Sequence, residues 1–117
     1  MGYQALYNNT SGTPNDAFGF QALYSNTTGA NNVAVGYQSL YTQTTATQNA
    51  ALGTYSLSAA TGGSNTGLGY AAGYKVTSGN NNISIGSNSC NTGTNDLTTG
   101  TGNVVVGASA GTNAAGG

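Results

Sequence analysis

Short apolar runs alternate with polar stretches at a nearly constant spacing along this chain. Each apolar run ends on a glycine, and the steps between successive glycines of this kind are 17, 17, 17, 16, 17 and 21 residues. These anchor glycines are Gly2, Gly19, Gly36, Gly53, Gly69, Gly86 and Gly107. A fixed period indicates a repeat architecture, in which each repeat is a small structural unit that stacks on its neighbours.

The run before each anchor alternates in side-chain size. Residues three and one before the anchor are usually the larger ones, as in Val33 and Val35 or Ile83 and Ile85. The residue between them is mostly small, as Ala34 is. Alternation with a period of two predicts a short strand whose larger side chains share one face, while the small face closely approaches another surface.

A second apolar run follows each anchor, as in residues 36–41, GYQSLY. The third residue after the anchor is small in every repeat. The fourth forms a column that changes toward the C-terminus: Leu6, Leu23, Leu40, Leu57, Gly73, Cys90 and Gly111. Because about 17 residues are too few for a helix plus a strand with two connections, we predict two short strands and two turns per coil.

These patterns together predict an all-β fold, a parallel β-solenoid or β-roll with about 17 residues per coil. Residues 1–117 are expected to form a single domain of about seven coils, one for each anchor glycine. Equivalent side chains of stacked coils then lie in columns about 4.8 Å apart. The longer last step predicts a loop insertion around residues 91–101, which carries Asp96 and is a place for a receptor or cation contact.

An asparagine stands four residues before every anchor glycine except the first. These asparagines are Asn15, Asn32, Asn49, Asn65, Asn82 and Asn103. In register they would form a stacked amide ladder that satisfies backbone groups in the turns. The anchor glycines are expected to adopt positive φ or to leave no room for a Cβ, because the chain turns sharply there. We therefore expect structural roles for both columns.

The composition leaves little material for catalysis. The charged residues are Asp16, Lys75 and Asp96, and the sequence has no His, Arg, Glu or Trp. Such a set provides neither a general acid/base pair, nor a base-activated nucleophile, nor a His/Cys metal cluster. We therefore expect no enzyme activity, no cofactor and no metal site.

The net charge of −1 bears on the choice of partner. Nucleic acids and anionic membranes are bound by clusters of Lys and Arg, and a single lysine forms no cluster. No apolar run approaches the roughly 20 residues of a membrane span. The first ten residues, MGYQALYNNT, have neither the basic nor the apolar region of a secretory signal. We expect no nucleic-acid partner, no membrane insertion and no signal peptide within this chain.

The apolar core of the repeat resembles the head repeats of trimeric autotransporter adhesins. The residues that carry the likeness are NVAVG at 32–36, NAALG at 49–53 and NISIG at 82–86. The segments GYQALY and GYQSLY, with NTTG-like turns, are similar to parts of phage tail fibres and related surface fibres. The resemblance covers nearly the whole chain and implies a left-handed β-roll, a trimeric state and a surface fibre with a binding or spacer role. It implies no catalytic residues, and the period here is longer than the shorter adhesin repeat.

Two aromatic columns follow the anchors. The first is Tyr3, Phe20, Tyr37 and Tyr70, and the second is Tyr7, Tyr24, Tyr41 and Tyr74. Stacked rings suit an interface between protomers, and they also suit the faces of sugars. We favour the interface, because columns that run along several coils fit a continuous contact better than a local site. Contact with surface glycans is the alternative.

A further column consists of threonines eight residues after the anchors: Thr10, Thr27, Thr44, Thr61, Thr77 and Thr94. Flat threonine arrays are also typical of ice-binding surfaces, but the neighbouring column is mixed and includes Ser11, Gly62 and Asn95. We interpret the threonines mainly as turn hydroxyls that bond to the backbone. Cys90 stands in the leucine column, and we expect a buried small hydrophobe there.

The sequence thus leads to one main functional hypothesis and two alternatives. The main one is a structural, self-assembling segment of an extracellular fibre or filament, at a cell surface or on a virion. The alternatives are an adhesin or phage tail-fibre segment that contacts glycans and, third, an ice-binding protein. The expected partner is a second copy, packed laterally or end to end, because a solenoid without polar caps exposes unpaired strand edges.

Overall fold

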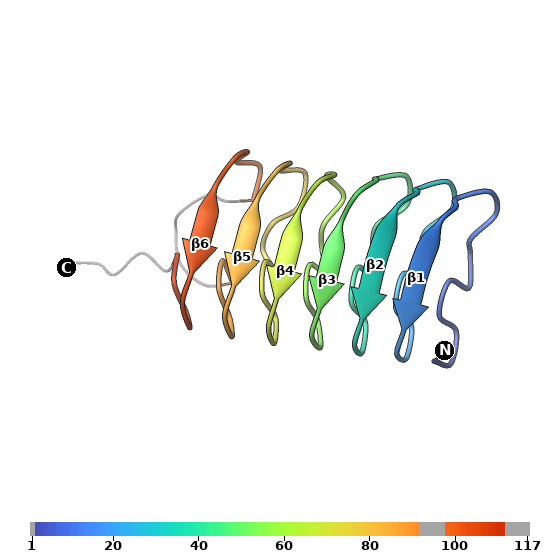
Figure 1. Cartoon of the computed structure of the whole chain (residues 1–117), viewed down its shortest axis with the longest axis horizontal. Coiled ribbons are helices and arrows are strands. Elements are labelled where there is room, and N and C mark those ends of the chain that lie inside the picture. The colour runs from blue at the N-terminus through green and yellow to red at the C-terminus, as the bar shows by residue number, and fades with distance from the viewer. Residues whose placement is uncertain (1, 92–97, 112–117) are drawn as a thin grey trace.

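The computed structural model of the chain describes residues 2–91 and 98–111, which form an elongated parallel β-solenoid (Figure 1). Its strands are β1 (Asn15–Phe18), β2 (Asn32–Val35), β3 (Ala50–Leu52), β4 (Thr66–Leu68), β5 (Ile83–Ile85) and β6 (Val104–Val106). They lie in one sheet in the order β1-β2-β3-β4-β5-β6. The molecule measures 47 × 22 × 15 Å. The predicted all-β class, the parallel stacking and the period of about 17 residues are therefore confirmed.

The register pairs equivalent residues of successive coils. Val35 lies beside Leu52, and Leu52 lies beside Leu68. Because the strands are parallel and the offset equals one repeat, every column of the sequence becomes a column in space. Within the part of the chain that the structure describes, no helix is long and apolar enough to cross a membrane.

The prediction of two strands per coil is wrong, because each described coil has one strand. The second apolar run is instead a series of turns, in which the residues two and four after the anchor have left-handed backbone. Gln21 and Leu23, for example, have φ of 54° and 50°. A strand would send the adjacent Ala22 and Leu23 to opposite faces, whereas both are fully buried. The turns let two neighbouring side chains enter the same narrow interior.

Hydrogen bonds between coils hold these turns in place. The backbone N–H of Gln21 donates to the carbonyl of Tyr3 in the preceding coil at 2.9 Å, and that of Leu23 donates to Ser39 in the following coil at 3.0 Å. Left-handed backbone costs about 1–2 kcal/mol for a residue with a Cβ. Bonds to the coils on both sides offset that cost, since they satisfy backbone groups that would otherwise be buried without partners.

The core is a thin layer between the strands and the turns. Small strand residues such as Ala34 and Ala51 face inward, and they pack against a column of fully buried leucines, Leu23, Leu40 and Leu57. The larger strand residues therefore point outward, which agrees with the small face being the one that approaches another surface. A narrow interior of this kind has room for one large side chain per coil.

The asparagine column crosses the interior as a ladder. The Oδ1 atom of Asn49 accepts the backbone N–H of Asn65 at 2.8 Å, and its Nδ2 donates to the carbonyl of Gly62 at 3.0 Å. The same Oδ1-to-N contact links each pair of neighbours from Asn15 to Asn103, at 2.8 to 3.0 Å. Every buried side-chain N or O atom in the described part has a hydrogen-bond partner. The polar ladder is thus compatible with burial.

The anchor glycines from the second to the last adopt φ between 119° and 137°. This region strongly favours glycine.

The loop insertion expected around 91–101 falls partly outside the described residues. Thr94 and Asp96 lie wholly outside them. Where the description resumes, the carbonyl of Thr98 accepts the backbone N–H of Thr77 at 2.8 Å. Thr98 therefore occupies the coil position next to Thr77.

Candidate functional site

Two surfaces of the described residues carry exposed apolar or aromatic side chains. One is the outward face of the sheet, and the other is the aromatic surface formed by the turns after the anchors. The charged residues among those described are Asp16 and Lys75. No group of three His, Cys, Asp or Glu residues that could hold a metal ion occurs among residues 2–91 and 98–111. The candidate sites are therefore surfaces for binding.

The outer sheet face is apolar and exposed. It consists of Phe18, Val33, Leu52, Leu68, Ile83, Val104 and Val106. The exposed fractions of these side chains run from 37% at Ile83 to 68% at Val104. They are exposed because the alternation along each strand turns the small residues inward and the large ones outward.

In-register pairing makes this face continuous. Val35, Leu52, Leu68 and Ile85 follow one another on neighbouring strands. At β1, Asp16 lies beside Val33 and places a carboxylate at the edge of the patch. Large contiguous apolar patches are uncommon on soluble monomers and mark interaction surfaces. The outer sheet face is therefore a candidate interface.

The aromatic residues predicted as columns do stack at the N-terminal end. Tyr3 and Phe20 have ring centroids 5.5 Å apart and an angle of 17° between their planes. Phe20 and Tyr37 continue that column at 5.2 Å and 8°. The second column, with Tyr7, Tyr24 and Tyr41, has centroid distances of 5.4 and 5.3 Å. In both columns neighbouring rings are nearly parallel, with angles of 4° to 17° between their planes.

Sequence reasoning missed Tyr55, which lies between the two columns. In its coil the positions of both columns are polar, Thr54 and Ser58. Tyr55 instead occupies the position that carries glutamine in the three preceding coils, Gln4, Gln21 and Gln38. Both aromatic columns are interrupted in the same coil, and a tyrosine stands next to the interrupted position of the first column. This coincidence was the sequence signal that could have identified Tyr55.

Tyr55 ends the parallel stacking and joins the two columns. Its ring is 5.3 Å from that of Tyr37 at an angle of 82°. It is also edge-on to Tyr70 at 6.3 Å and to Tyr74 at 6.4 Å. Desolvation and the neighbouring Tyr37 raise the pKa of Tyr55 above its ordinary value.

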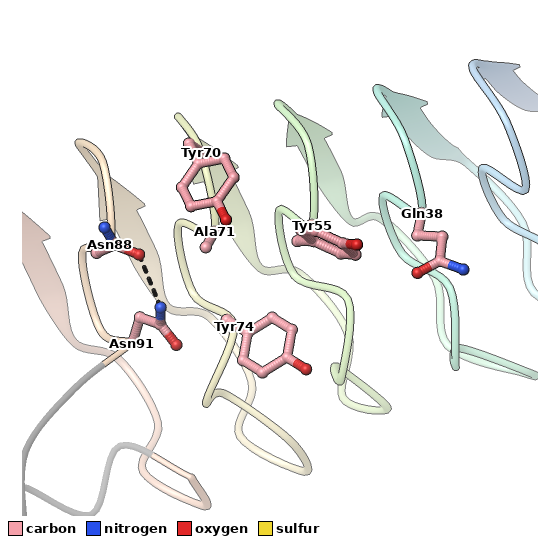
Figure 2. A pocket seen from close by; sticks show the side chains of 7 residues that line it. All are labelled: Gln38, Tyr55, Tyr70, Ala71, Tyr74, Asn88 and Asn91. Atoms are coloured by element: carbon pink, nitrogen blue, oxygen red, sulfur yellow. Dashed lines mark hydrogen bonds between the residues drawn. The ribbon is translucent and has the colours of Figure 1, made fainter.

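Tyr55, Tyr70 and Tyr74 line an open groove of about 440 Å³, which we call the tyrosine groove; in Figure 2 they lie between Gln38 and the pair Asn88 and Asn91. Its lining residues are Gln38, Tyr55, Tyr70, Ala71, Tyr74, Asn88 and Asn91. They come from four successive coils and from the turn segments that follow the anchors. Figure 2 shows the strands behind these turns, so the groove and the outer sheet face belong to different parts of the coil.

Amides complete the groove. The Nδ2 atom of Asn91 donates to Oδ1 of Asn88 at 2.8 Å. At the opposite end, the groove is bounded by Gln38, the last member of a ladder of glutamines. The Nε2 atom of Gln38 donates to Oε1 of Gln21 at 2.8 Å. Lys75 lies nearby, with its Nζ atom 5.9 Å from the centroid of the Tyr74 ring. None of the lining residues carries a formal charge.

The threonine column is engaged with the backbone. The hydroxyl of Thr10 donates to the carbonyl of Thr27 at 2.9 Å, and that of Thr27 donates to Thr44 at 3.1 Å. Cys90 is buried, and its Sγ accepts the hydroxyl of Ser84 at 3.0 Å. These groups are used in holding the coils together.

Comparisons with known proteins bear on how far these surfaces can be interpreted by analogy. No protein-family model, curated protein or solved structure matches the chain. Function is therefore inferred from the surfaces themselves.

Proposed function

We propose that this chain is a structural segment of an extracellular fibre, in which copies pack against one another through the outer sheet face. The observation that carries the proposal is the row of outward apolar side chains over six in-register strands. Burying apolar surface stabilises association by about 25 cal/mol per Å² before ordering costs are subtracted. A flat, continuous face is suited to such packing.

Charge and strand edges support the same function. With a net charge of −1, copies repel one another only weakly. β1 and β6 are the outermost strands of the described sheet. The edge of an outermost strand can pair with a strand of another copy, so end-to-end contact is a second part of the proposal. The extracellular location, the left-handed coil and the trimeric state rest on the resemblance to surface fibres.

The test places charges on the outer sheet face. In the variant Leu52→Lys with Leu68→Lys, two exposed side chains on neighbouring strands become cationic. The matched control is Tyr3→Lys with Tyr7→Lys, which adds the same charge at exposed aromatic positions on the turn surface. Sedimentation velocity and light scattering over a concentration series report the assembly state.

We expect the natural chain and the control to associate, whereas the Leu52/Leu68 variant should lose the lateral association and keep at most end-to-end contacts, with an unchanged circular dichroism spectrum. A natural chain that stays monomeric at high concentration would contradict the proposal. Association that survives in the Leu52/Leu68 variant but is lost in the control would move the interface to the aromatic columns instead.

Ice binding is the weaker alternative. An ice-binding face needs free hydroxyls in a regular array, whereas hydroxyls of the threonine column, such as those of Thr10 and Thr61, donate to carbonyls of the next coil. Glycan contact is the stronger alternative because of the tyrosine groove. Such contact is independent of fibre assembly.

A further inference from the structure

We propose that the tyrosine groove binds a neutral pyranose sugar. The aliphatic face of the sugar would lie on the rings of Tyr70 and Tyr74, and its hydroxyls would reach the amide of Asn88 in the next coil. This goes beyond the fibre function, because the groove lies on the turn segments and the self-association surface lies on the strands. A fibre could carry such a site in every copy.

The orientation of the rings supports a sugar. In the two stacked columns, interplanar angles of 4° to 17° leave the ring faces turned toward each other. Around Tyr55 the angles are 82° to 90°. Tyr70 is 52% exposed and Tyr74 is 37% exposed, so both rings offer surface to a ligand in the groove. An aromatic face carries negative charge density, which favours the weakly positive C–H groups on one side of a pyranose.

Hydrogen-bonding groups stand on both sides of these rings. In the glutamine ladder the Oε1 atoms of Gln4 and Gln21 each accept an amide from the next coil. The ladder stops at Tyr55, so Oε1 of Gln38 accepts no hydrogen bond from any residue that the structure describes. Across the groove, Nδ2 of Asn88 makes a long contact of 3.4 Å with the Ser87 hydroxyl. These groups can exchange water for sugar hydroxyls, which both donate and accept.

Charge and size point to a small neutral ligand. The lining has no ionised group, which disfavours a charged ligand in favour of a neutral one. The ammonium group of Lys75 lies over the Tyr74 ring in a cation–π contact. Lys75 is not one of the residues that line the groove. A volume of about 440 Å³ falls within the range of roughly 300–1,000 Å³ for small-molecule sites.

The test uses saturation-transfer NMR on the full chain with the methyl glycosides of glucose, galactose, mannose and N-acetylglucosamine as probes. A monosaccharide in an open groove is expected to bind with a dissociation constant on the order of 1 mM, because so few atoms make contact. A methyl glucuronide tests whether a carboxylate is needed. Its signal should be no stronger than that of the glucoside.

The central variant is Tyr55→Gln. It removes the ring and installs the residue type that fills this position in three preceding coils at a similar φ, 50° at Gln38 against 59° at Tyr55. The fold should therefore be kept, with the glutamine ladder extended by one coil. We expect the dissociation constant for the sugar to rise by about tenfold or more. The Tyr55 ring would no longer line the groove, and its edge-on contacts would no longer hold the rings of Tyr70 and Tyr74. The control Tyr7→Ala removes an exposed ring outside the groove and should bind as the natural chain does.

Each outcome decides the proposal. Binding in the natural chain and Tyr7→Ala but not in Tyr55→Gln supports it. No saturation transfer from any neutral probe to the natural chain overturns it, as does equal binding by Tyr55→Gln. Binding of the glucuronide alone, lost in Lys75→Ala, overturns the neutral class. Because assembly is measured separately with the Leu52/Leu68 variant, failure here and failure of the fibre function are distinguishable.

Discussion

The residue at each anchor meets two constraints at once. At Gly36 φ is 132°, and an added Cβ would lie 2.6 Å from both the carbonyl carbon and the carbonyl oxygen of Gly53 in the next coil. The first constraint is conformational and the second is steric. Both arise because the coils are stacked at the separation of adjacent strands, and the chain turns at this point.

We predict that Gly36→Val lowers stability by about 1–3 kcal/mol from backbone strain alone, with a further loss as the coils above it shift. Gly102→Val is the matched control: its φ is also positive, at 71°, but no atom lies within 4 Å of the place that a Cβ would take. Thermal unfolding should show a much larger drop in melting temperature for Gly36→Val. Equal drops in the two variants would mean that space at the anchor is irrelevant.

The leucine column also shows what a single position must satisfy. Leu23, Leu40 and Leu57 fill the interior with left-handed backbone, φ 48° to 50°. Gly73 takes the same place with φ 68°, and an added Cβ there would meet the Leu57 side chain at 2.6 Å. The change from leucine to glycine therefore relieves backbone strain and makes room for the neighbouring leucine.

For the core we predict that Leu40→Ala destabilises the fold by about 2–5 kcal/mol, the usual cost of a large-to-small change at a buried site. Leu40 is fully buried, whereas Tyr7 is 62% exposed. Tyr7→Ala, which removes an exposed ring stacked on Tyr24, should therefore cost less, about 0.5–1.5 kcal/mol. Chemical denaturation of the two variants at one protein concentration compares them directly.

At the scale of the element, each coil combines one strand with a stack of turns, and polar ladders join the coils. Asn49 also contacts a second polar column, because its Nδ2 donates to Oε1 of the buried Gln43 at 2.9 Å. Gln43 in turn donates to Asn26 at 3.1 Å. The asparagine ladder and the column of Asn9, Asn26 and Gln43 thus meet at Asn49.

Asn49→Ala is expected to cost about 3 kcal/mol or more, because it leaves the Asn65 N–H, the Gly62 carbonyl and the Gln43 amide without this partner, each worth roughly 1–3 kcal/mol when buried. Asn8→Ala is the control, since its amide donates to Tyr24 O at an exposed site. Hydrogen exchange at the Asn65 amide should accelerate in Asn49→Ala alone. Retained protection there would show that the ladder does not hold the coil.

At the scale of the whole molecule, contacts connect each coil mainly with its neighbours. Strand contacts occur between β1 and β2, β2 and β3, and so on to β5 and β6. Stability in such a solenoid is approximately a sum over coils and interfaces. A whole repeat is therefore a removable unit, provided that the register of the columns is preserved.

We predict that deleting residues 37–53, one repeat that includes β3, gives a shorter solenoid that still unfolds cooperatively at a lower temperature. The deletion brings Gly36 to Thr54 and restores every column. Deleting residues 37–44 removes half a coil and places turn residues opposite strand residues, so the parallel sheet should be lost. Circular dichroism and thermal unfolding of both variants check this, and a folded half-coil deletion would refute the modular description.

Much of the fold could be predicted from the sequence because the repeat is local and regular. Seven anchors in phase require equivalent residues to stack, and the register found for Asn15 and Asn32 follows from that offset. The second strand was predicted wrongly. Adjacent apolar residues such as Ala22 and Leu23 indicate that the segment is buried, but they do not indicate whether its backbone is extended or has left-handed φ. Left-handed φ at non-glycine residues is stabilised by bonds to neighbouring coils, which no single repeat contains.

The candidate surfaces, like the fold, were only partly predictable from the sequence. The sequence by itself determined the repeat period, the columns of equivalent residues and the small number of charged side chains, because these depend on residue order and type alone. Only the tertiary structure decided that the larger strand side chains face outward, since the interior has space for the leucines and the small strand residues. It alone also placed Tyr55 edge-on to Tyr37, Tyr70 and Tyr74, because a groove built from four coils exists only when those coils are stacked.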